Sequence, residues 1–335
     1  MLRTTILGTG HYVPDRVVTN DDLAKVMATS DEWIQQRTGI KTRHWVDFAK
    51  EPMGSSDLGT RAAQRALADA HLTPADIDCI IYGTLSPDRC FPGDGVLVQA
   101  KLDVPAGVPA IDLRNQCSAF LYGLSVADAF IRTGTYRRIL LIGAEVHSSG
   151  LDMSDAGREV SVLFGDGGAA VVLGPTEEPN RGVLSVRIHA DGRQADLLTV
   201  AYPSSAMMPR VSAEMLSTGI QWPAMNGKAV FKQAVSRMPE VVLEVLKDAG
   251  LQVADIDVFV PHQANQRITE MVARRLEVPE EKVVSNIASY GNTTAASIPL
   301  ALDEAVHQGR IKPGNLVCVA AFGSGFTWGA ALLRW

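Results

Sequence analysis

Several features that would mark particular classes of protein are missing from this sequence. No apolar run approaches the roughly 20 residues that a membrane-spanning helix needs, so we expect no membrane segment. The four cysteines form no CxxC pair, which argues against a disulfide framework and against a metal site. The net charge of −6 gives no general basis for binding nucleic acid. A cytoplasmic protein without metal fits these absences best.

What is present describes a large globular protein. The chain has 335 residues, of which 46% are hydrophobic and 20% are charged. This length predicts two domains or one large duplicated domain. Helical patterns are expected over 20–27, from Ser30 onward, over 56–70 and over 121–133, and apolar strands over 78–83, 108–113 and 316–320. Because strands alternate with helices, we expect an α/β protein with a mainly parallel sheet in each half.

The sequence also repeats itself, which indicates an internal duplication. The pattern L-x-D-A-x-L-x-x-A-D-I-D occurs at 67–78 and again at 246–257. Glycine-rich turns at 164–167 and 322–325 each precede an apolar run with an Ala-Ala pair. We therefore expect two stacked halves in a five-layered domain. Residues 1–174 would carry a nucleophilic cysteine, and residues 175–335 would carry a histidine and an asparagine that act with it.

The nucleophile candidate is Cys117. The apolar strand expected over 108–113 delivers it to the start of the helix expected over 121–133. Unpaired backbone N–H groups and the positive end of the helix dipole stabilise a thiolate at such a place. The competing interpretation is a small buried residue, as most unpaired cysteines are.

The repeat pairs this cysteine with an asparagine. When the two helices that follow are aligned on their aspartates and terminal glycines, Cys117 and Asn292 fall at equivalent places, each at a helix start. His262 follows the strand-like run 258–260, and ligands of open α/β sheets gather at the carboxyl ends of strands. Taken alone, His262 is equally a core or capping residue and Asn292 a turn residue.

A thiol, an imidazole and a carboxamide together suit thioester chemistry. Cys117 can accept an acyl group, while His262 and Asn292 can donate to the enolate left when a malonyl thioester loses carbon dioxide. Backbone N–H groups of Cys117 and Ser324 are the expected oxyanion donors. A rival interpretation is a Cys–His hydrolase with asparagine as the orienting residue. Duplicated halves with equivalent helix starts are not a protease pattern.

Four further motifs carry a family resemblance. These are SDEWI with RTGI over 30–40, VPHQAN at 260–265, GNT with AAS over 291–297, and AFGSGFTWG at 321–329. With them the chain resembles the β-ketoacyl-(acyl carrier protein) synthase III family of the thiolase superfamily over nearly its whole length. The resemblance implies the thiolase-like αβαβα fold and a Cys117, His262 and Asn292 triad. It also implies condensation of an acyl-CoA primer with malonyl acyl carrier protein, a homodimer, and no cofactor beyond the coenzyme A substrate.

The same resemblance implies binding residues. For coenzyme A and the acyl substrate they are Trp33, Arg37, Phe91, Arg158, Gly227, Phe231 and Asn265. For the acidic carrier protein they are Lys228, Lys232 and Arg267. The plainer alternatives are core packing for Trp33, a surface ion pair for Arg37 and a solvated basic face for the lysines.

The sequence departs from the family around the nucleophile. The usual run is Ala-Ala-Ala-Cys-Ala-Gly, whereas this chain has Arg114, Asn115 and Gln116 before the cysteine, and Ser324 replaces a usual glycine. The departure leaves open a relative from secondary metabolism that joins two acyl-CoA molecules or acylates a hydroxyl or amine. A non-catalytic subunit is disfavoured because all three catalytic residues are intact. No role is assigned to three polar residues of the first half, which are Glu145, His147 and Glu159.

Overall fold

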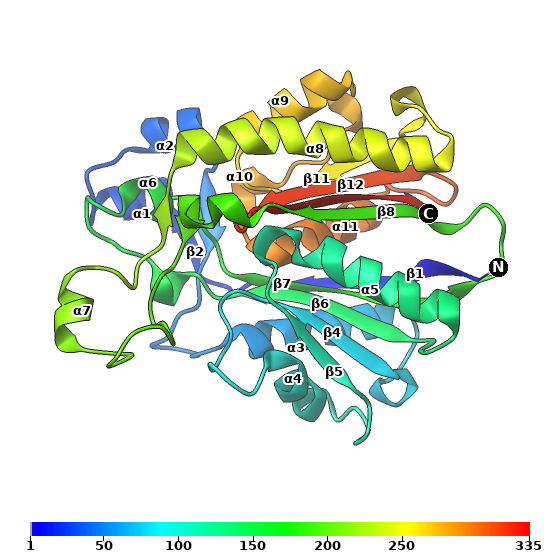
Figure 1. Ribbon diagram of the computed structural model, residues 1–335, viewed down its shortest axis with the longest axis horizontal. Helices are drawn as coiled ribbons and strands as arrows, with labels where there is room; N and C mark the ends of the chain where they lie inside the picture. The colour runs from blue at the N-terminus through cyan, green and yellow to red at the C-terminus, as the bar shows by residue number, and fades with distance from the viewer. Residues whose placement is uncertain (1) are drawn as a thin grey trace.

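The computed structural model describes residues 2–335, which fold into five alternating layers of helices and sheets (Figure 1). Helices α8 and α9 cover the outer face of one sheet, α3 and α4 cover the outer face of the other, and α5 and α11 lie between the two sheets. The bounds are α3 Ser55–Asp69, α4 Asp94–Leu102, α5 Ala119–Thr133, α8 Gly227–Ala249, α9 Gln266–Leu276 and α11 Ser297–His307. The predicted five-layered αβαβα fold is confirmed.

The first sheet has the strand order β1-β7-β6-β4-β5. Its strands are β1 Arg3–Tyr12, β4 Cys79–Gly83, β5 Ala110–Leu113, β6 Ile139–Glu145 and β7 Gly167–Thr176. Strand β4 pairs in parallel with β5 and β6, whereas β7 pairs antiparallel with β1 and β6. Strand β5 therefore forms one edge of this sheet.

The second sheet repeats this order with one strand fewer, as β8-β13-β12-β11. Its strands are β8 Gly182–Ala190, β11 Val258–Pro261, β12 Leu316–Gly323 and β13 Thr327–Arg334. Strand β11 pairs in parallel with β12, and β13 pairs antiparallel with β12 and β8. A single parallel bridge between Phe259 and Val283 stands where β4 pairs with β5 in the first sheet.

The expectation of mainly parallel sheets is wrong, because each sheet is mixed. Strands β12 and β13 form a hairpin closed by the short turn after Gly323, and two strands joined by so short a connection run antiparallel. The equivalent strands β6 and β7 are likewise antiparallel. Apolar runs predict burial of a strand but do not give its direction.

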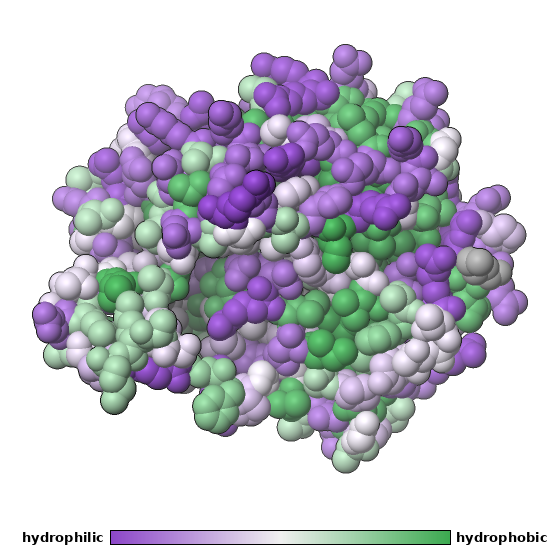
Figure 2. Space-filling model, in the orientation of Figure 1, coloured by the Kyte–Doolittle hydropathy of each residue, from purple (hydrophilic) through white to green (hydrophobic). Residues whose placement is uncertain are grey.

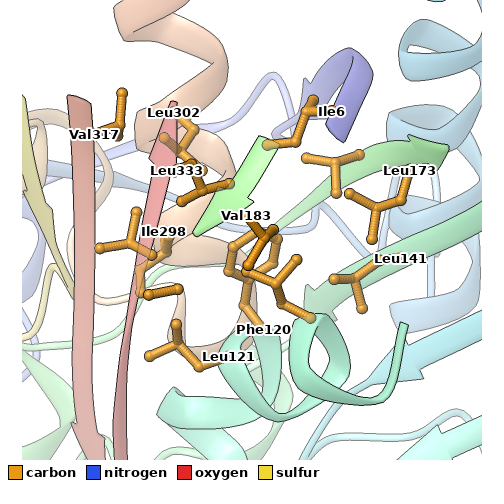
Figure 3. Close-up of a cluster of buried hydrophobic side chains, with 14 of the residues drawn as sticks. Ile6, Phe120, Leu121, Leu141, Leu173, Val183, Ile298, Leu302, Val317 and Leu333 are labelled. Atoms are coloured by element: carbon orange, nitrogen blue, oxygen red, sulfur yellow. The ribbon is translucent and has the colours of Figure 1, made fainter. Parts of the chain in front are cut away.

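The strands are buried on both faces, as their continuous apolar runs predict. In β12, Val317, Val319 and Ala321 pack toward the middle layer, while Cys318, Ala320 and Phe322 pack beneath α8 and α9. The middle layer joins the two halves. Figure 3 shows Leu121 of α5 and Ile298 and Leu302 of α11 among side chains of both sheets, such as Leu141 and Leu333.

The remaining elements are short. They are β2 Val17–Thr19, α1 Asn20–Ala24, α2 Asp31–Thr38, β3 Thr42–His44, α6 Arg158–Ser161, β9 Leu198–Thr199, α7 Ala213–Ser217, β10 Ala224–Met225 and α10 Ile287–Tyr290, with single 3₁₀ turns between elements. The predicted start of α2 is confirmed, because the Ser30 hydroxyl accepts a hydrogen bond of 3.1 Å from the Trp33 N–H. Within residues 2–335, no helix has the length and apolar character needed to cross a membrane.

The chain passes from one sheet to the other between β7 and β8, over residues 177–181. The division into 1–174 and 175–335 falls two residues before β7 ends at Thr176. That division of the chain stays a prediction.

Candidate active site

Cys117 lies in a 3₁₀ turn that joins an edge strand to a helix of the middle layer. Strand β5 ends at Leu113, the turn η2 covers Gln116–Ser118, and α5 begins at Ala119. The residue before the cysteine, Gln116, has φ of +45°, which is uncommon for a residue with a side chain. This tight entry leaves Cys117 only 9% exposed.

The end of β12 packs against Cys117. A Cβ atom added to Gly323 would lie 2.8 Å from the Cys117 Cβ atom and 3.1 Å from its backbone nitrogen. Only glycine allows so close an approach at this position. This close packing of Gly323 on Cys117 places the loop that contains Ser324 next to the Cys117 sulfur.

The resting form of the cysteine is the thiol. Burial raises the pKa of Cys117 to about 12, and the nearby Glu145 carboxyl acts in the same direction. The backbone N–H groups of Cys117 and Ser324 and the Thr294 hydroxyl partly oppose this rise in pKa. Burial thus opposes the thiolate that the helix start is expected to favour, because loss of hydration raises the pKa more than the backbone donors lower it. Ionisation requires a base.

His262 directly follows β11 and is held by two contacts. Its backbone N–H donates to the Ala320 carbonyl at 2.8 Å, and its Nδ1 atom lies 2.5 Å from the Oγ atom of Ser297. Its Nε2 atom is buried and has no hydrogen-bond partner among residues 2–335. Burial lowers the pKa of His262 to about 3, so the imidazole is neutral. A neutral imidazole with one free nitrogen can take or give a single proton.

Asn292 lies just before the 3₁₀ turn η7, Thr294–Ala296, which leads into α11. Its Oδ1 atom accepts a hydrogen bond of 2.8 Å from the Thr294 N–H. Because the oxygen is engaged, the Nδ2 group is the donor that this carboxamide can still offer to a substrate. The turn η7 packs against η2, so that the asparagine and the cysteine enter the middle layer side by side. This is the placement that the repeat predicts.

Ser324 offers its backbone rather than its side chain to the cysteine. The Ser324 hydroxyl is turned away and donates to the Leu198 carbonyl at 2.5 Å. The Ser324 N–H group acts on the Cys117 sulfur together with the N–H group of Cys117 itself. Replacement of a glycine by Ser324 therefore leaves two backbone donors at the nucleophile.

A second cluster is formed by Trp33 and two arginines. The Arg37 Cζ atom lies 4.3 Å from the Trp33 ring centroid, and the Arg158 Cζ atom lies 4.8 Å from it. Asn265 caps α9 by accepting from the Arg267 N–H at 2.9 Å, and it donates to the Arg37 carbonyl at 2.9 Å. The structure thus brings Arg158, which is distant in the sequence, to Trp33 and Arg37, which lie one turn apart on α2.

The N-terminal ends of α8 and α9 carry the predicted carrier-protein residues. Lys228 and Lys232 are exposed one turn apart on α8, and Arg267 is exposed on α9. Gly227 begins α8, and Phe231 packs on the outer core beneath it. The surface over α8 is largely hydrophilic, as Figure 2 shows.

The remaining residues that the sequence singled out differ in their exposure. Phe91 is 83% exposed on the loop between β4 and α4. Arg114 is exposed, Asn115 and Gln116 are half-buried beside the nucleophile, and Glu159 is exposed on α6. Within residues 2–335, no three histidine, cysteine or acidic side chains are grouped in a way that would hold a metal ion.

Sequence reasoning missed two residues that contact the catalytic candidates, Ser297 and Thr294. It noted Glu145 and His147 without giving them a role. Glu145 is fully buried and accepts hydrogen bonds from the Ser86 hydroxyl at 2.6 Å and the Thr84 hydroxyl at 3.0 Å. Burial raises the pKa of Glu145 to about 7. The only signal in the sequence for Thr294 is its place two residues after Asn292.

The fold and this set of residues define a thiolase-like condensing enzyme. Residues 111–192 match the family model for 3-oxoacyl-[acyl-carrier-protein (ACP)] synthase III, and residues 246–335 match the model for its C-terminal part. The chain is 48% identical to the beta-ketoacyl-[acyl-carrier-protein] synthase III of Alkalilimnicola ehrlichii, over 98% of both chains.

Solved structures of this family also align with the chain over nearly its whole length. The 3-oxoacyl-[acyl-carrier-protein] synthase III of Aquifex aeolicus aligns with a TM-score of 0.89 and 42% identity, over 99% of this chain and 100% of that one. The enzyme of Pseudomonas aeruginosa aligns with a TM-score of 0.89 and 40% identity, over 99% and 98%. The chain belongs to the β-ketoacyl-acyl carrier protein synthase III family, and it is an acyltransferase.

Proposed function

We propose that this protein starts fatty acid synthesis by condensing an acyl-CoA primer with malonyl acyl carrier protein through an acyl-Cys117 intermediate. One observation carries the proposal. The backbone N–H groups of Cys117 and Ser324 act on the buried thiol of Cys117. The turn that contains Cys117 packs against the turn that follows Asn292. A nucleophile with two oxyanion donors and a neighbouring carboxamide suits acyl transfer.

In the first step the Cys117 sulfur takes the acyl group. The free Nε2 atom of neutral His262 accepts the thiol proton as the sulfur attacks the acyl thioester carbonyl, because burial disfavours a separate thiolate. The N–H groups of Cys117 and Ser324 stabilise the oxyanion. The new C–S bond forms as the bond to coenzyme A breaks, and coenzyme A leaves with the proton returned from His262.

In the second step the malonyl thioester loses carbon dioxide, and the electron pair of the broken C–C bond forms an enolate. Protonated Nε2 of neutral His262 and the Nδ2 group of Asn292 donate to the enolate oxygen. The Ser297 hydroxyl can donate to or accept from Nδ1, so it supports both tautomers of the ring. The carbanion attacks the acyl carbon, and a C–C bond forms as the C–S bond to Cys117 breaks. Cys117 leaves as a thiolate and takes up one proton from solvent to return to the thiol.

Substrate delivery uses the two clusters beyond the cysteine. We assign the nucleotide end of coenzyme A to Trp33, Arg37 and Arg158, because an aromatic ring and guanidinium groups suit a base and its phosphates. The assigned pantetheine path runs past Gly227, Phe231 and Asn265. The assigned docking surface for the acidic carrier protein is the basic set Lys228, Lys232 and Arg267.

A homodimer is supported by two features of the single chain. Strand β5 is an unpaired edge, and such strands offer free N–H and C=O groups for pairing with a second chain. Phe91, 83% exposed, is the residue we assign to closing the acyl pocket of the partner. A cytoplasmic location stays a prediction from the cysteine pattern.

Acyl labelling tests the proposal. After incubation with radiolabelled acyl-CoA, the wild-type protein should carry label and the Cys117→Ala protein should not. The Asn292→Ala protein should carry label and form no product with malonyl acyl carrier protein. Equal labelling of wild type and Cys117→Ala would contradict the mechanism.

The second candidate function is transfer of the acyl group to another acceptor, as in a secondary-metabolism relative. The observation that favours it is the polar run Arg114, Asn115 and Gln116 directly before the nucleophile. Assays of the acylated protein with malonyl carrier protein, a second acyl-CoA, and hydroxyl or amine acceptors separate the two. Turnover without malonyl carrier protein would favour the second.

A further inference from the structure

One buried imidazole near the nucleophile has no part in the steps above. His147 follows β6 and is 7% exposed. Its backbone N–H donates to the Asp166 Oδ1 atom at 2.7 Å, and its ring packs on Phe164 with centroids 4.5 Å apart. Burial lowers the pKa of His147 to about 3, which leaves the ring neutral. A neutral imidazole has one N–H donor and one acceptor nitrogen.

The side chain that meets this ring is Thr294. The His147 Nε2 atom lies 2.8 Å from the Thr294 Oγ1 atom. Thr294 has φ of +49°, a left-handed conformation that β-branched residues rarely adopt. The Asn292 Oδ1 atom holds this turn through the Thr294 N–H at 2.8 Å. Strain of this kind points to a functional constraint on the position of the side chain.

The turn can reach His147 because β6 has a glycine opposite it. A Cβ atom on Gly143 would lie 2.3 Å from the Ala295 carbonyl oxygen, so any other residue would push η7 away from β6. The turn η7, which contains Thr294, also packs against η2, which contains Cys117. The Thr294 hydroxyl is among the groups that lower the pKa of Cys117, so it connects His147 with the surroundings of the nucleophile.

We infer that His147 is a positioning residue for Thr294. Its Nε2–H group donates to the Thr294 oxygen, so that the Thr294 proton is left to donate to the Cys117 sulfur. A hydroxyl has one proton, and an imidazole that donates to its oxygen leaves that proton for another acceptor. The result favours the thiolate that receives the acyl group. The inference rests on the proposed function, in which Cys117 is the nucleophile.

Two other groups act on the Cys117 sulfur, and both are the same in the parent protein and in the His147 and Thr294 variants. The buried Glu145 carboxyl from β6 opposes ionisation of Cys117. His262 from the end of β11 takes its proton in the proposed first step. His147 acts only through Thr294, which distinguishes it from both.

The test is the pH dependence of Cys117 alkylation by iodoacetamide, in full-length protein that carries Cys90→Ser because Cys90 is an exposed thiol. In His147→Leu and in Thr294→Val, the rate of Cys117 alkylation at a given pH should fall, about tenfold for each unit by which the pKa of Cys117 rises. Thr294→Ser and His147→Gln keep a hydroxyl and a side-chain donor, so both should stay near the parent profile.

The double variant shows whether His147 acts through Thr294. His147→Leu should add nothing to the shift in a Thr294→Val background. Phe164→Leu removes the stacked ring and keeps the donor, so its profile should match the parent. If His147→Leu does not fold, His147→Phe replaces it as a ring without a donor.

Three results would overturn the inference. They are an unchanged profile in the His147 variant, an equal shift in the Thr294→Val background, and an equal shift in Phe164→Leu. The proposed function fails separately, if the parent protein takes no acyl label on Cys117.

Discussion

The Nδ1 atom of His262 lies 2.5 Å from the hydroxyl of Ser297, the first residue of α11. This contact fixes the imidazole so that Nε2 is left without a partner in the part of the chain that the structure describes. The backbone N–H of Gln263 also donates to the same hydroxyl, at 3.3 Å. Ser297 therefore sets the orientation of the residue that we assign as base and donor.

Removing this contact should slow catalysis. In Ser297→Ala we expect kcat for condensation to fall about tenfold to a hundredfold, the size of effect that outer partners have when they orient a metal-bound histidine. The assay is product formation from acyl-CoA and malonyl acyl carrier protein. Ser285→Ala is the matched control, because the Ser285 hydroxyl donates to Gln266 on the surface. Equal rates in both variants would remove the assigned role of Ser297.

The glycine beside the nucleophile should tolerate no side chain. In Gly323→Ala the new Cβ atom would lie 2.8 Å from the Cys117 Cβ atom, and overpacking of this kind costs about 1–3 kcal/mol. We expect acyl labelling of Cys117 to be lost while the protein still unfolds cooperatively. Gly150→Ala, where an added Cβ meets nothing within 4 Å, should label normally. Normal labelling of Gly323→Ala would mean that the two segments are further apart than described.

The cluster of Trp33, Arg37 and Arg158 should affect the binding of acyl-CoA but not of a substrate that lacks the nucleotide. In Arg37→Ala we expect KM for acyl-CoA to rise about tenfold with little change in kcat, as loss of one charged contact to a ligand predicts. An acyl-pantetheine substrate lacks the nucleotide, and its KM should be the same in wild type and variant. Lys25→Ala removes an exposed cation that pairs with Asp22, and it serves as the control. A similar rise in KM for both substrates would place the nucleotide elsewhere.

Glu145 should make stability depend on pH. Its pKa is raised by burial to about 7 from 4.5, so the folded state holds the proton more tightly than the unfolded state does. This contribution is fully present below pH 4.5 and is lost as pH rises through 7. The free energy of unfolding of wild type, relative to Glu145→Gln, should therefore fall by up to about 3 kcal/mol over that range.

Denaturant unfolding at a series of pH values measures this difference. The exposed variant Glu159→Gln should follow wild type throughout. A wild-type curve that runs parallel to Glu145→Gln from pH 4.5 to 7.5 would show that Glu145 does not bind a proton more tightly in the folded state.

The equivalent placement of two candidate residues was predictable because it depends on the repeat. The equivalence of Cys117 and Asn292 follows from matching residue patterns. The structure places Cys117 in the 3₁₀ turn before α5 and Asn292 just before the 3₁₀ turn that leads into α11. Strand and helix positions followed from apolar periodicity and from caps such as Ser30. These are local signals, and local signals survive in a single sequence.

What could not be predicted depends on contacts between distant segments. The pairing of His147 with Thr294 joins residues that are 147 apart in the chain. The thiolate at Cys117 was predicted from a dipole effect of about 0.3–1 kcal/mol, whereas depth of burial, which no short pattern reveals, raises its pKa to about 12. The predicted direction of the strands was wrong for a similar reason, because a buried strand has the same apolar run whether it pairs in parallel or antiparallel.

The most direct measurement of the central claim is the intact mass of the Asn292→Ala protein after incubation with acyl-CoA and then with malonyl acyl carrier protein. We predict a gain of one acyl group per chain, located by peptide mapping to Cys117, that persists after the carrier protein is added. A mass that never changes, or an acyl group located on any residue other than Cys117, would contradict the account.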